Sequence, residues 1–134
     1  MNIIRVRTRT RCELVEVTDE VASAVRASGV REGVVVIQSL HTTAGLTINE
    51  NADPDVVRDL VAKVERLVPK REDYYRHAEG NSDSHLKTSL FGPSLTVIVS
   101  EGELVLGTWQ GIYLCEWDGP RERKLAVQVL RAEG

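Results

Sequence analysis

The chain has 134 residues, enough for one domain with a single hydrophobic core, and we expect residues 1–134 to fold as one unit. Hydrophobic residues make up 42% and charged residues 28%, and no apolar run approaches the roughly 20 residues that a membrane-spanning helix needs. A net charge of -3 gives no general attraction to nucleic acid, and the N-terminus has no signal-peptide pattern. These features predict a soluble cytoplasmic protein with no nucleic-acid partner and no membrane partner.

The first part of the chain predicts two strands, a helix and a buried strand. Residues 2–17 alternate apolar and polar side chains around a break at 9–11. Thr18 is predicted to cap a helix that ends at residues 28–29, and the continuous apolar run at 34–40 predicts a fully buried strand. Four arginines recur at every second position, so a strand places them on one face, where we expect them to contact solvent: Arg5, Arg7, Arg9 and Arg11.

The rest of the chain predicts two more helices and further strands. Asp53 is expected to cap a helix that starts at Pro54, because apolar residues then repeat at helical spacing until Pro69. Residues 69–81 form a polar connection of the length and composition of a functional loop. Ser82 or Asp83 is expected to cap a short helix that stops at Gly92. The remaining extended segments are 46–49, 95–99, 104–106, 109–117 and 124–130.

All three histidines lie in two polar stretches that contain glycine, residues 41–45 and 77–87. Imidazoles beside hydroxyls, carboxylates and a lysine supply the groups of a metal or phosphate site. One histidine by itself is more often a surface or hydrogen-bonded residue, and the spacing of His77 and His85 is not that of a helical metal pair. The grouping of three favours a functional site.

The polar residues around the histidines have a structural and a functional interpretation. Thr42 and Thr43 either cap a turn or bind phosphate. Lys87 and Ser89 either contact solvent or bind phosphate. Trp109 is either strand packing or a stacking platform. Arg121 and Arg123, just past a Gly-Pro turn, are either exposed or a bidentate anion clamp. The carboxylates either cap helices and turns or orient the imidazoles and bind a hard cation: Glu50, Asp53 and Asp83.

Three long blocks of this sequence resemble the signature blocks of the YjbQ family, also called UPF0047. They are HTTAGLTINEN at 41–51 followed by DPDV, the stretch from His77 to Leu90 with EGNSDSHLKTSL, and GTWQGIY at 107–113 followed by EWDGPR. The resemblance implies an α+β protein, a single-domain β-sandwich with flanking helices, that assembles as a homotrimer. It also implies a secondary thiamine-phosphate synthase, which joins a hydroxymethylpyrimidine diphosphate to a thiazole phosphate with loss of diphosphate.

A site for that reaction needs cations and hydrogen-bond donors around the departing diphosphate. We therefore expect a divalent metal, zinc or magnesium, held by His41, His77 and His85. The expected catalytic residues are His41, His85, Lys87, Glu50 and Asp83. The expected substrate and phosphate ligands are Thr42, Thr43, Ser89, Trp109 and Arg121.

Two other functions use the same residues. A metal-dependent phosphate-ester hydrolase would activate water at the three histidines, with Glu50 or Asp83 as general base. A non-catalytic trimeric binding protein would hold an anionic metabolite in the same pocket. In every case the expected partner is a small phosphorylated metabolite.

Overall fold

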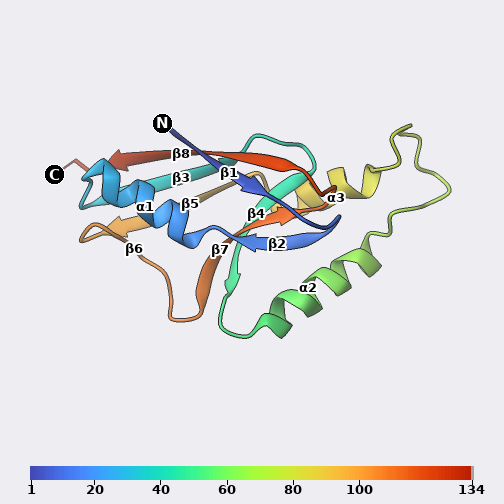
Figure 1. The fold of residues 1–134 in the computed structure, drawn as a ribbon, viewed down its shortest axis with the longest axis horizontal. Coiled ribbons are helices and arrows are strands. Elements are labelled where there is room, and N and C mark those ends of the chain that lie inside the picture. Colours follow the sequence, from blue (N-terminus) through green and yellow to red (C-terminus); the bar gives the residue numbers. More distant parts are fainter. Residues whose placement is uncertain (134) are drawn as a thin grey trace.

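The computed structural model describes residues 1–133, which form three helices and two antiparallel sheets (Figure 1). This arrangement confirms the predicted α+β class. No helix in this range is long and apolar enough to cross a membrane. The elements in chain order are β1 (Asn2–Arg7), β2 (Glu13–Glu16), α1 (Thr18–Ser28), β3 (Gly33–Ser39), β4 (Ala44–Glu50), α2 (Pro54–Leu67), α3 (Ser82–Phe91), β5 (Ser94–Ser100), β6 (Glu103–Leu104), β7 (Gln110–Glu116) and β8 (Glu122–Arg131).

The strand order of the two sheets brings distant loops together at one end of the molecule. The five-stranded sheet has the order β1-β8-β3-β5-β6, and the three-stranded sheet has the order β2-β7-β4. In the smaller sheet Glu116, the last residue of β7, lies opposite Ala44, the first residue of β4. The loop before β4 and the loop after β7 are therefore neighbours, and α3 packs beside them on β4.

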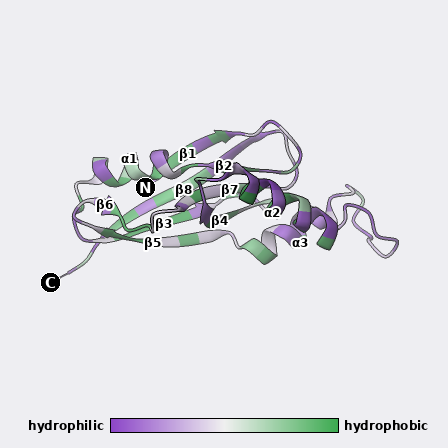
Figure 2. Cartoon of the chain, turned by 90° about the horizontal axis from the view of Figure 1, so that it is seen from below, coloured by the Kyte–Doolittle hydropathy of each residue, from purple (hydrophilic) through white to green (hydrophobic). Residues whose placement is uncertain are grey.

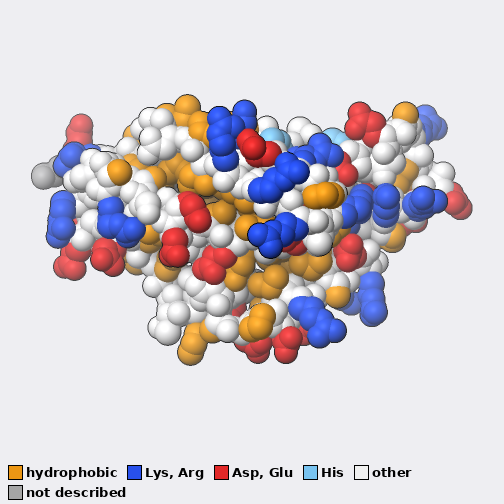
Figure 3. All heavy atoms as spheres, in the orientation of Figure 1, with side chains coloured by type: hydrophobic (Ala, Val, Ile, Leu, Met, Phe, Trp, Pro, Cys, Tyr) orange, Lys and Arg blue, Asp and Glu red, His pale blue; other side chains and the backbone are white. Residues whose placement is uncertain are grey.

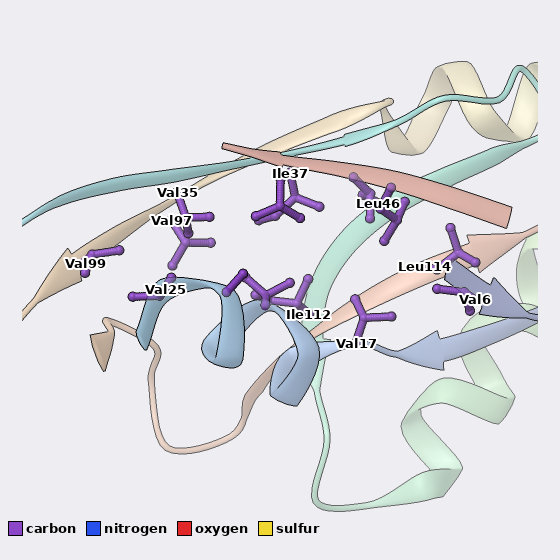
Figure 4. Packing of buried hydrophobic residues seen from close by; sticks show 14 of the residues in the cluster. Val6, Val17, Val25, Val35, Ile37, Leu46, Val97, Val99, Ile112 and Leu114 are labelled. Atoms are coloured by element: carbon purple, nitrogen blue, oxygen red, sulfur yellow. The ribbon is translucent and has the colours of Figure 1, made fainter. Parts of the chain in front are cut away.

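The hydrophobic core fills the space between the two sheets, as expected for a β-sandwich (Figure 4). Alternate residues of each strand point inward, and each fully buried aliphatic side chain contributes about 1.5–3 kcal/mol relative to an exposed one. The predicted buried strand at 34–40 is buried on one face only, because Val34 and Val36 are half-buried on its outer face. The completely buried members of the core are Val21, Val35, Ile37, Ala44, Leu46, Ile112, Leu114 and Leu125.

Helix α1 closes one end of the sandwich. Val21 and Val25 lie one turn apart and pack into the core, and Gly29 ends the helix in the left-handed conformation with φ of 71°. The N-cap is Val17, so Thr18 does not cap the helix as predicted. The Thr18 hydroxyl instead accepts a hydrogen bond from Ile112 N at 2.9 Å, which ties the start of α1 to β7.

Helix α2 begins as the sequence predicts and then packs differently from its pattern. The Asp53 side chain accepts a hydrogen bond from Asp55 N at 2.9 Å, and Pro54 is the first helical residue. None of its residues is buried, although apolar side chains repeat along one side. The helix lies against β2 at the margin of the molecule (Figure 1).

Helix α3 approaches β4 closely, and its inward side is polar. A Cβ at Gly45 would lie 2.9 Å from the carbonyl oxygen of Gly92, so glycine allows this contact. The N-cap is Asn81 and makes no side-chain capping bond, which differs from the predicted cap at Ser82 or Asp83. Asp83 turns into the protein instead. The inward residues are Asp83, Ser84, Lys87 and Thr88, whereas Leu86 and Leu90 are exposed. Figure 2 shows this end of the chain with α2 and the long polar loop beside it.

Candidate functional site

Two of the predicted site histidines meet at the start of α3. The rings of His77 and His85 are in edge-to-face contact, with centroids 5.4 Å apart. Together with Ser82 they line a depression of about 300 Å³, which we call the histidine depression. Both rings keep access to solvent, since His77 is exposed and His85 is half-buried. Figure 3 shows open histidine surface along the upper edge of the molecule. A ligand can therefore reach this pair.

The third histidine is held by a strand. His41 Nε2 accepts a hydrogen bond from Lys124 N of β8 at 2.8 Å. Burial is the main cause that lowers the pKa of His41, and Arg123 lowers it further, while Glu116 opposes them in part. The ring is therefore neutral at physiological pH. A neutral imidazole has one lone pair for a partner, and the lone pair of His41 is already engaged.

The predicted three-histidine metal site does not assemble within this chain. Among residues 1–133, no group of three or more histidine, cysteine, aspartate or glutamate residues is placed to hold an ion. His77 and His85 offer two imidazoles, but the free ring nitrogen of His41 carries its proton. Both oxygens of Asp83 are also engaged by cations. These donors do not fit a zinc or magnesium centre in a single subunit.

Asp83 is the centre of a buried cluster with two cations, which we call the Asp83 cluster. Arg11 donates to its two oxygens at 3.1 and 3.0 Å, and Lys87 Nζ donates at 2.8 Å. Burial by itself would raise the pKa of Asp83, but the bonds from Arg11 and Lys87 outweigh it and lower the pKa below its usual range. The carboxylate is ionised, so two positive charges meet one negative charge.

Lys87 does not occupy the position predicted for it. Its side chain is 1% exposed, lies over the ring of Trp117 and pairs with Asp83, so it has no open path to phosphate oxygens. Contrary to the prediction, Arg11 does not share a solvent-facing strand with the other N-terminal arginines. It lies in the bend between β1 and β2 with its side chain only 28% exposed, and its Nη2 also lies 3.3 Å from Ser84 Oγ.

Glu116 is the centre of a second buried cluster, the Glu116 cluster, which joins three loops. Arg123 donates to both of its carboxylate oxygens, Thr8 Oγ1 donates at 2.7 Å, and Asp118 N donates at 3.0 Å. Burial opposes ionisation, but these donors lower the pKa of Glu116 below its usual range. Arg123 also donates to the hydroxyl and carbonyl oxygens of Thr43. The cluster fixes the loop that carries His41 against β8.

The remaining predicted phosphate ligands are spread over this end of the molecule. Thr43 is buried and serves the Glu116 cluster, whereas Thr42 and Ser89 are exposed. Arg121 donates through Nε to the carbonyl oxygen of Asp118 and through Nη2 to its carboxylate. The side chain of Arg121 is 52% exposed, so the rest of its guanidinium faces solvent.

Two predicted site residues lie at the other end of the smaller sheet. Glu50 pairs with Gln110 at the end of β4 that is opposite to Ala44, and Trp109 precedes β7 at the same end. Seven extended residues span about 20 Å, so neither residue joins the histidines within one chain. Trp109 is 62% exposed, and the Glu50 side chain accepts from Asp53 N at 3.2 Å.

Sequence reasoning missed the roles of Arg11, Glu116 and Trp117 at this end. Its expectation for Arg123, exposed or part of an anion clamp, is wrong, because Arg123 is buried and donates to Glu116. A signal for this pair was available, because Glu116 and Arg123 stand at inward positions of their strands, where a charge requires a partner. Cys12 does not add a nucleophile. Burial mainly, and Glu65 as well, raise the pKa of its thiol to about 11, so it stays protonated.

Comparisons of sequence and of structure with known proteins point to the same family. A family model described as UPF0047 protein YjbQ-like matches residues 2–132. A UPF0047 protein of Methanocaldococcus jannaschii is 48% identical over 94% of this chain and 91% of its own length. A crystal structure of a YjbQ/UPF0047 protein from Clostridium acetobutylicum has 47% identity and a TM-score of 0.95, covering 97% of this chain and 100% of that one. A YbjQ-like protein from Sulfolobus solfataricus, 34% identical, has a TM-score of 0.93 over 98% of this chain and 96% of its own.

These comparisons overturn the predicted reaction. The curated relatives are named only as UPF0047 proteins, and the Sulfolobus solfataricus protein is described as one of unknown function. None of these names supports a thiamine-phosphate synthase, so that prediction from the resemblance is wrong. The function must be argued from the site.

Proposed function

This chain belongs to the UPF0047 YjbQ-like family, and on that premise we propose that the α3 end of the molecule binds a small phosphorylated metabolite. The observation that carries the proposal is the charge of the Asp83 cluster. Arg11 and Lys87 bring two positive charges to one carboxylate, and Lys87 is almost completely buried.

An unbalanced charge under a low-dielectric surface is costly, and an anion bound nearby lowers that cost. Asp118, on the loop after β7, offsets part of this charge because it acts on Arg11, but its carboxylate is also hydrogen-bonded to Arg121. The first turn of α3 adds the positive end of a helix dipole beside Ser82. These features favour the binding of a dianionic group, such as a phosphate, at the histidine depression.

A small ligand suits this site better than a nucleic acid. The net charge of -3 would repel an extended phosphate backbone, and the histidine depression of about 300 Å³ matches one small molecule. The hydrolase alternative lacks the three metal ligands it requires within residues 1–133. Binding without turnover is therefore the function we propose.

Calorimetry with inorganic phosphate, diphosphate and glycerol phosphate tests the proposal. We expect saturable binding that weakens about tenfold in Lys87→Met, since that variant removes the excess charge. Lys63→Met, which removes an exposed lysine of α2, is the matched control and should bind as the wild type does. No binding at millimolar anion, or an equal loss in both variants, would contradict the proposal. Release of phosphate from glycerol phosphate would show turnover and restore the hydrolase.

We also propose that the chain forms a homotrimer, as the family resemblance implies. Two apolar surfaces of one chain support self-association. The apolar side of α2 is only half-buried, and the outer face of the five-stranded sheet exposes Ile3, Ile98 and Leu130. Light scattering at micromolar concentration should give three times the mass of the chain. A monomer would contradict the proposed homotrimer and would leave the proposal for the ligand site unaffected.

A further inference from the structure

The imidazole of His41 takes the place of a strand carbonyl. Leu40 N donates to the carbonyl oxygen of Lys124, and Lys124 N donates to His41 Nε2. Both backbone groups of Lys124 are thus satisfied by the residues that follow β3. Because Nε2 accepts a hydrogen bond, the neutral ring must carry its proton on Nδ1. The fold therefore fixes one tautomer of this histidine.

The fixed tautomer leaves His41 with only one chemical role. Its lone pair is engaged by Lys124 N, so it cannot act as a general base or ligate a metal without losing that bond. What remains is Nδ1–H, and no acceptor among residues 1–133 binds it. His41 is half-buried at the surface, so this donor is available to a ligand.

The charges around the ring favour an anion as that ligand. Three cations act on the ring of His41, namely Arg121, Arg123 and Lys124, and Glu116 is the carboxylate that opposes them there. Arg121 is itself paired with Asp118, with its side chain 52% exposed. Glu116 and Arg123 neutralise each other inside the Glu116 cluster. Arg121 uses two hydrogen bonds for Asp118, and a guanidinium has five N–H donors, so several remain for a ligand.

We propose that His41 Nδ1–H and Arg121 form a second oxyanion site, at the end of β3, that binds a phosphate group without a metal. A neutral imidazole supplies a directed hydrogen bond, and the guanidinium supplies charge and a planar fork. This site differs from the histidine depression in its residues, because His41 lies in the loop after β3 and Arg121 in the loop before β8. The two sites are linked through Asp118, which accepts from both Arg121 and Asn81.

The tautomer can be measured directly, because the chain has only three histidines. Long-range proton–nitrogen NMR spectra of the uniformly labelled protein would be assigned with His77→Gln and His85→Gln. We expect the His41 signals at neutral pH to show a protonated Nδ1 and a bare Nε2, unchanged when zinc is added. A protonated Nε2, or a zinc-induced shift of the His41 nitrogens, would overturn the inference.

A titration with inorganic phosphate tests the anion. The His41 Nδ1 signal should move with saturable dependence, and Arg121→Gln should weaken this binding about tenfold. Arg131→Gln is the matched control, because it removes the same charge at the far end of β8, roughly 30 Å away by strand length. No response of His41, or an equal loss in both variants, would overturn the site.

Failure of this site and failure of the proposed function are distinguishable in the same spectra. Phosphate bound at the histidine depression perturbs the His77 and His85 signals and depends on Lys87. Phosphate bound at the second site perturbs His41 and depends on Arg121. Thermal melting of Arg121→Gln is the control for folding of the variant, and the wild-type titration by itself decides whether His41 responds.

Discussion

Two buried ionic clusters lie side by side at the α3 end, and they differ in charge balance. In the Glu116 cluster one guanidinium meets one carboxylate, and each carboxylate oxygen has a further donor. In the Asp83 cluster one carboxylate meets both a guanidinium and an ammonium. The charges of the Glu116 cluster sum to zero, whereas those of the Asp83 cluster sum to one positive charge.

The difference separates a structural task from a binding task. A cluster with no net charge gains nothing from a ligand, so the Glu116 cluster serves to hold Thr8, Thr43 and the loop after β7 in one arrangement. An unbalanced cluster is stabilised by an anion that binds near it. The two clusters should therefore respond differently when single charges are removed.

Breaking the Glu116 cluster should give the largest loss of stability. Arg123→Met leaves the Glu116 carboxylate buried with no cation, and we expect the free energy of unfolding to fall by about 3–5 kcal/mol. Urea denaturation measures this loss. The double variant Arg123→Met with Glu116→Leu removes both charges and should recover part of it. A double variant less stable than Arg123→Met would contradict the interpretation.

Removing the only carboxylate of the unbalanced cluster should cost somewhat less. Asp83→Asn leaves Arg11 and Lys87 facing each other, but Arg11 is 28% exposed and can turn toward water. We expect a loss of about 2–3 kcal/mol in urea denaturation, and added phosphate should recover more stability than in the wild type. An Asp83→Asn protein as stable as the wild type would show that the cluster is not strained by its charge.

Removing the excess charge should have a small effect on stability. Lys87→Met keeps the two hydrogen bonds between Arg11 and Asp83 and replaces a buried ammonium by an apolar side chain of similar volume, so we expect a change of about 1 kcal/mol or less in the free energy of unfolding. The affinity for phosphate should fall in the same variant. A loss as large as that of Arg123→Met would mean that both clusters are purely structural.

The pH dependence of stability should separate these groups into two windows. The pKa values of Asp83, Glu116 and His41 are all lowered in the folded chain, so the unfolded chain binds more protons and stability falls as the pH decreases. For His41 the fall begins near its ordinary value of 6.5, and for Glu116 near 4.5.

Thermal melting measured across this range checks the assignment. His41→Gln should flatten only the upper window, and Glu116→Gln should flatten only the lower one. An unchanged upper window in His41→Gln would mean that the neutral state of His41 contributes nothing to stability. This is the smallest of the expected effects, because His41 is only half-buried.

The sequence predicts where a helix begins better than it predicts which side of the helix is buried. The start of α2 follows from Asp53 and Pro54, because capping depends on neighbouring residues alone. Its packing does not follow, since an apolar side indicates burial against some surface without saying that the surface belongs to the same chain. In α3 the same rule fails, because Leu86 and Leu90 face solvent while charged residues face inward.

The site was predictable only in its local parts. His77 and His85 were grouped correctly because they lie in one stretch of polar sequence. The partners of Asp83 and Glu116 could not be predicted, because Arg11 is 72 residues from Asp83 in the sequence and the pairing depends on strand order. The sequence also contains no sign that Glu50 and Trp109 lie at the far end of the smaller sheet.

The pairing of the first strand with the last sets the timing of folding during synthesis. β1 forms its ladder with residues 122–127 of β8, and β8 also separates β1 from β3. While the ribosome is still translating the first 120 residues, β1 has no partner strand and β3 lacks one of its two neighbours. The five-stranded sheet, and with it the Glu116 cluster that needs Arg123, closes only after the C-terminal strand has emerged. Until then the nascent chain exposes two unpaired strand edges, which is the stage at which chaperones would be most needed.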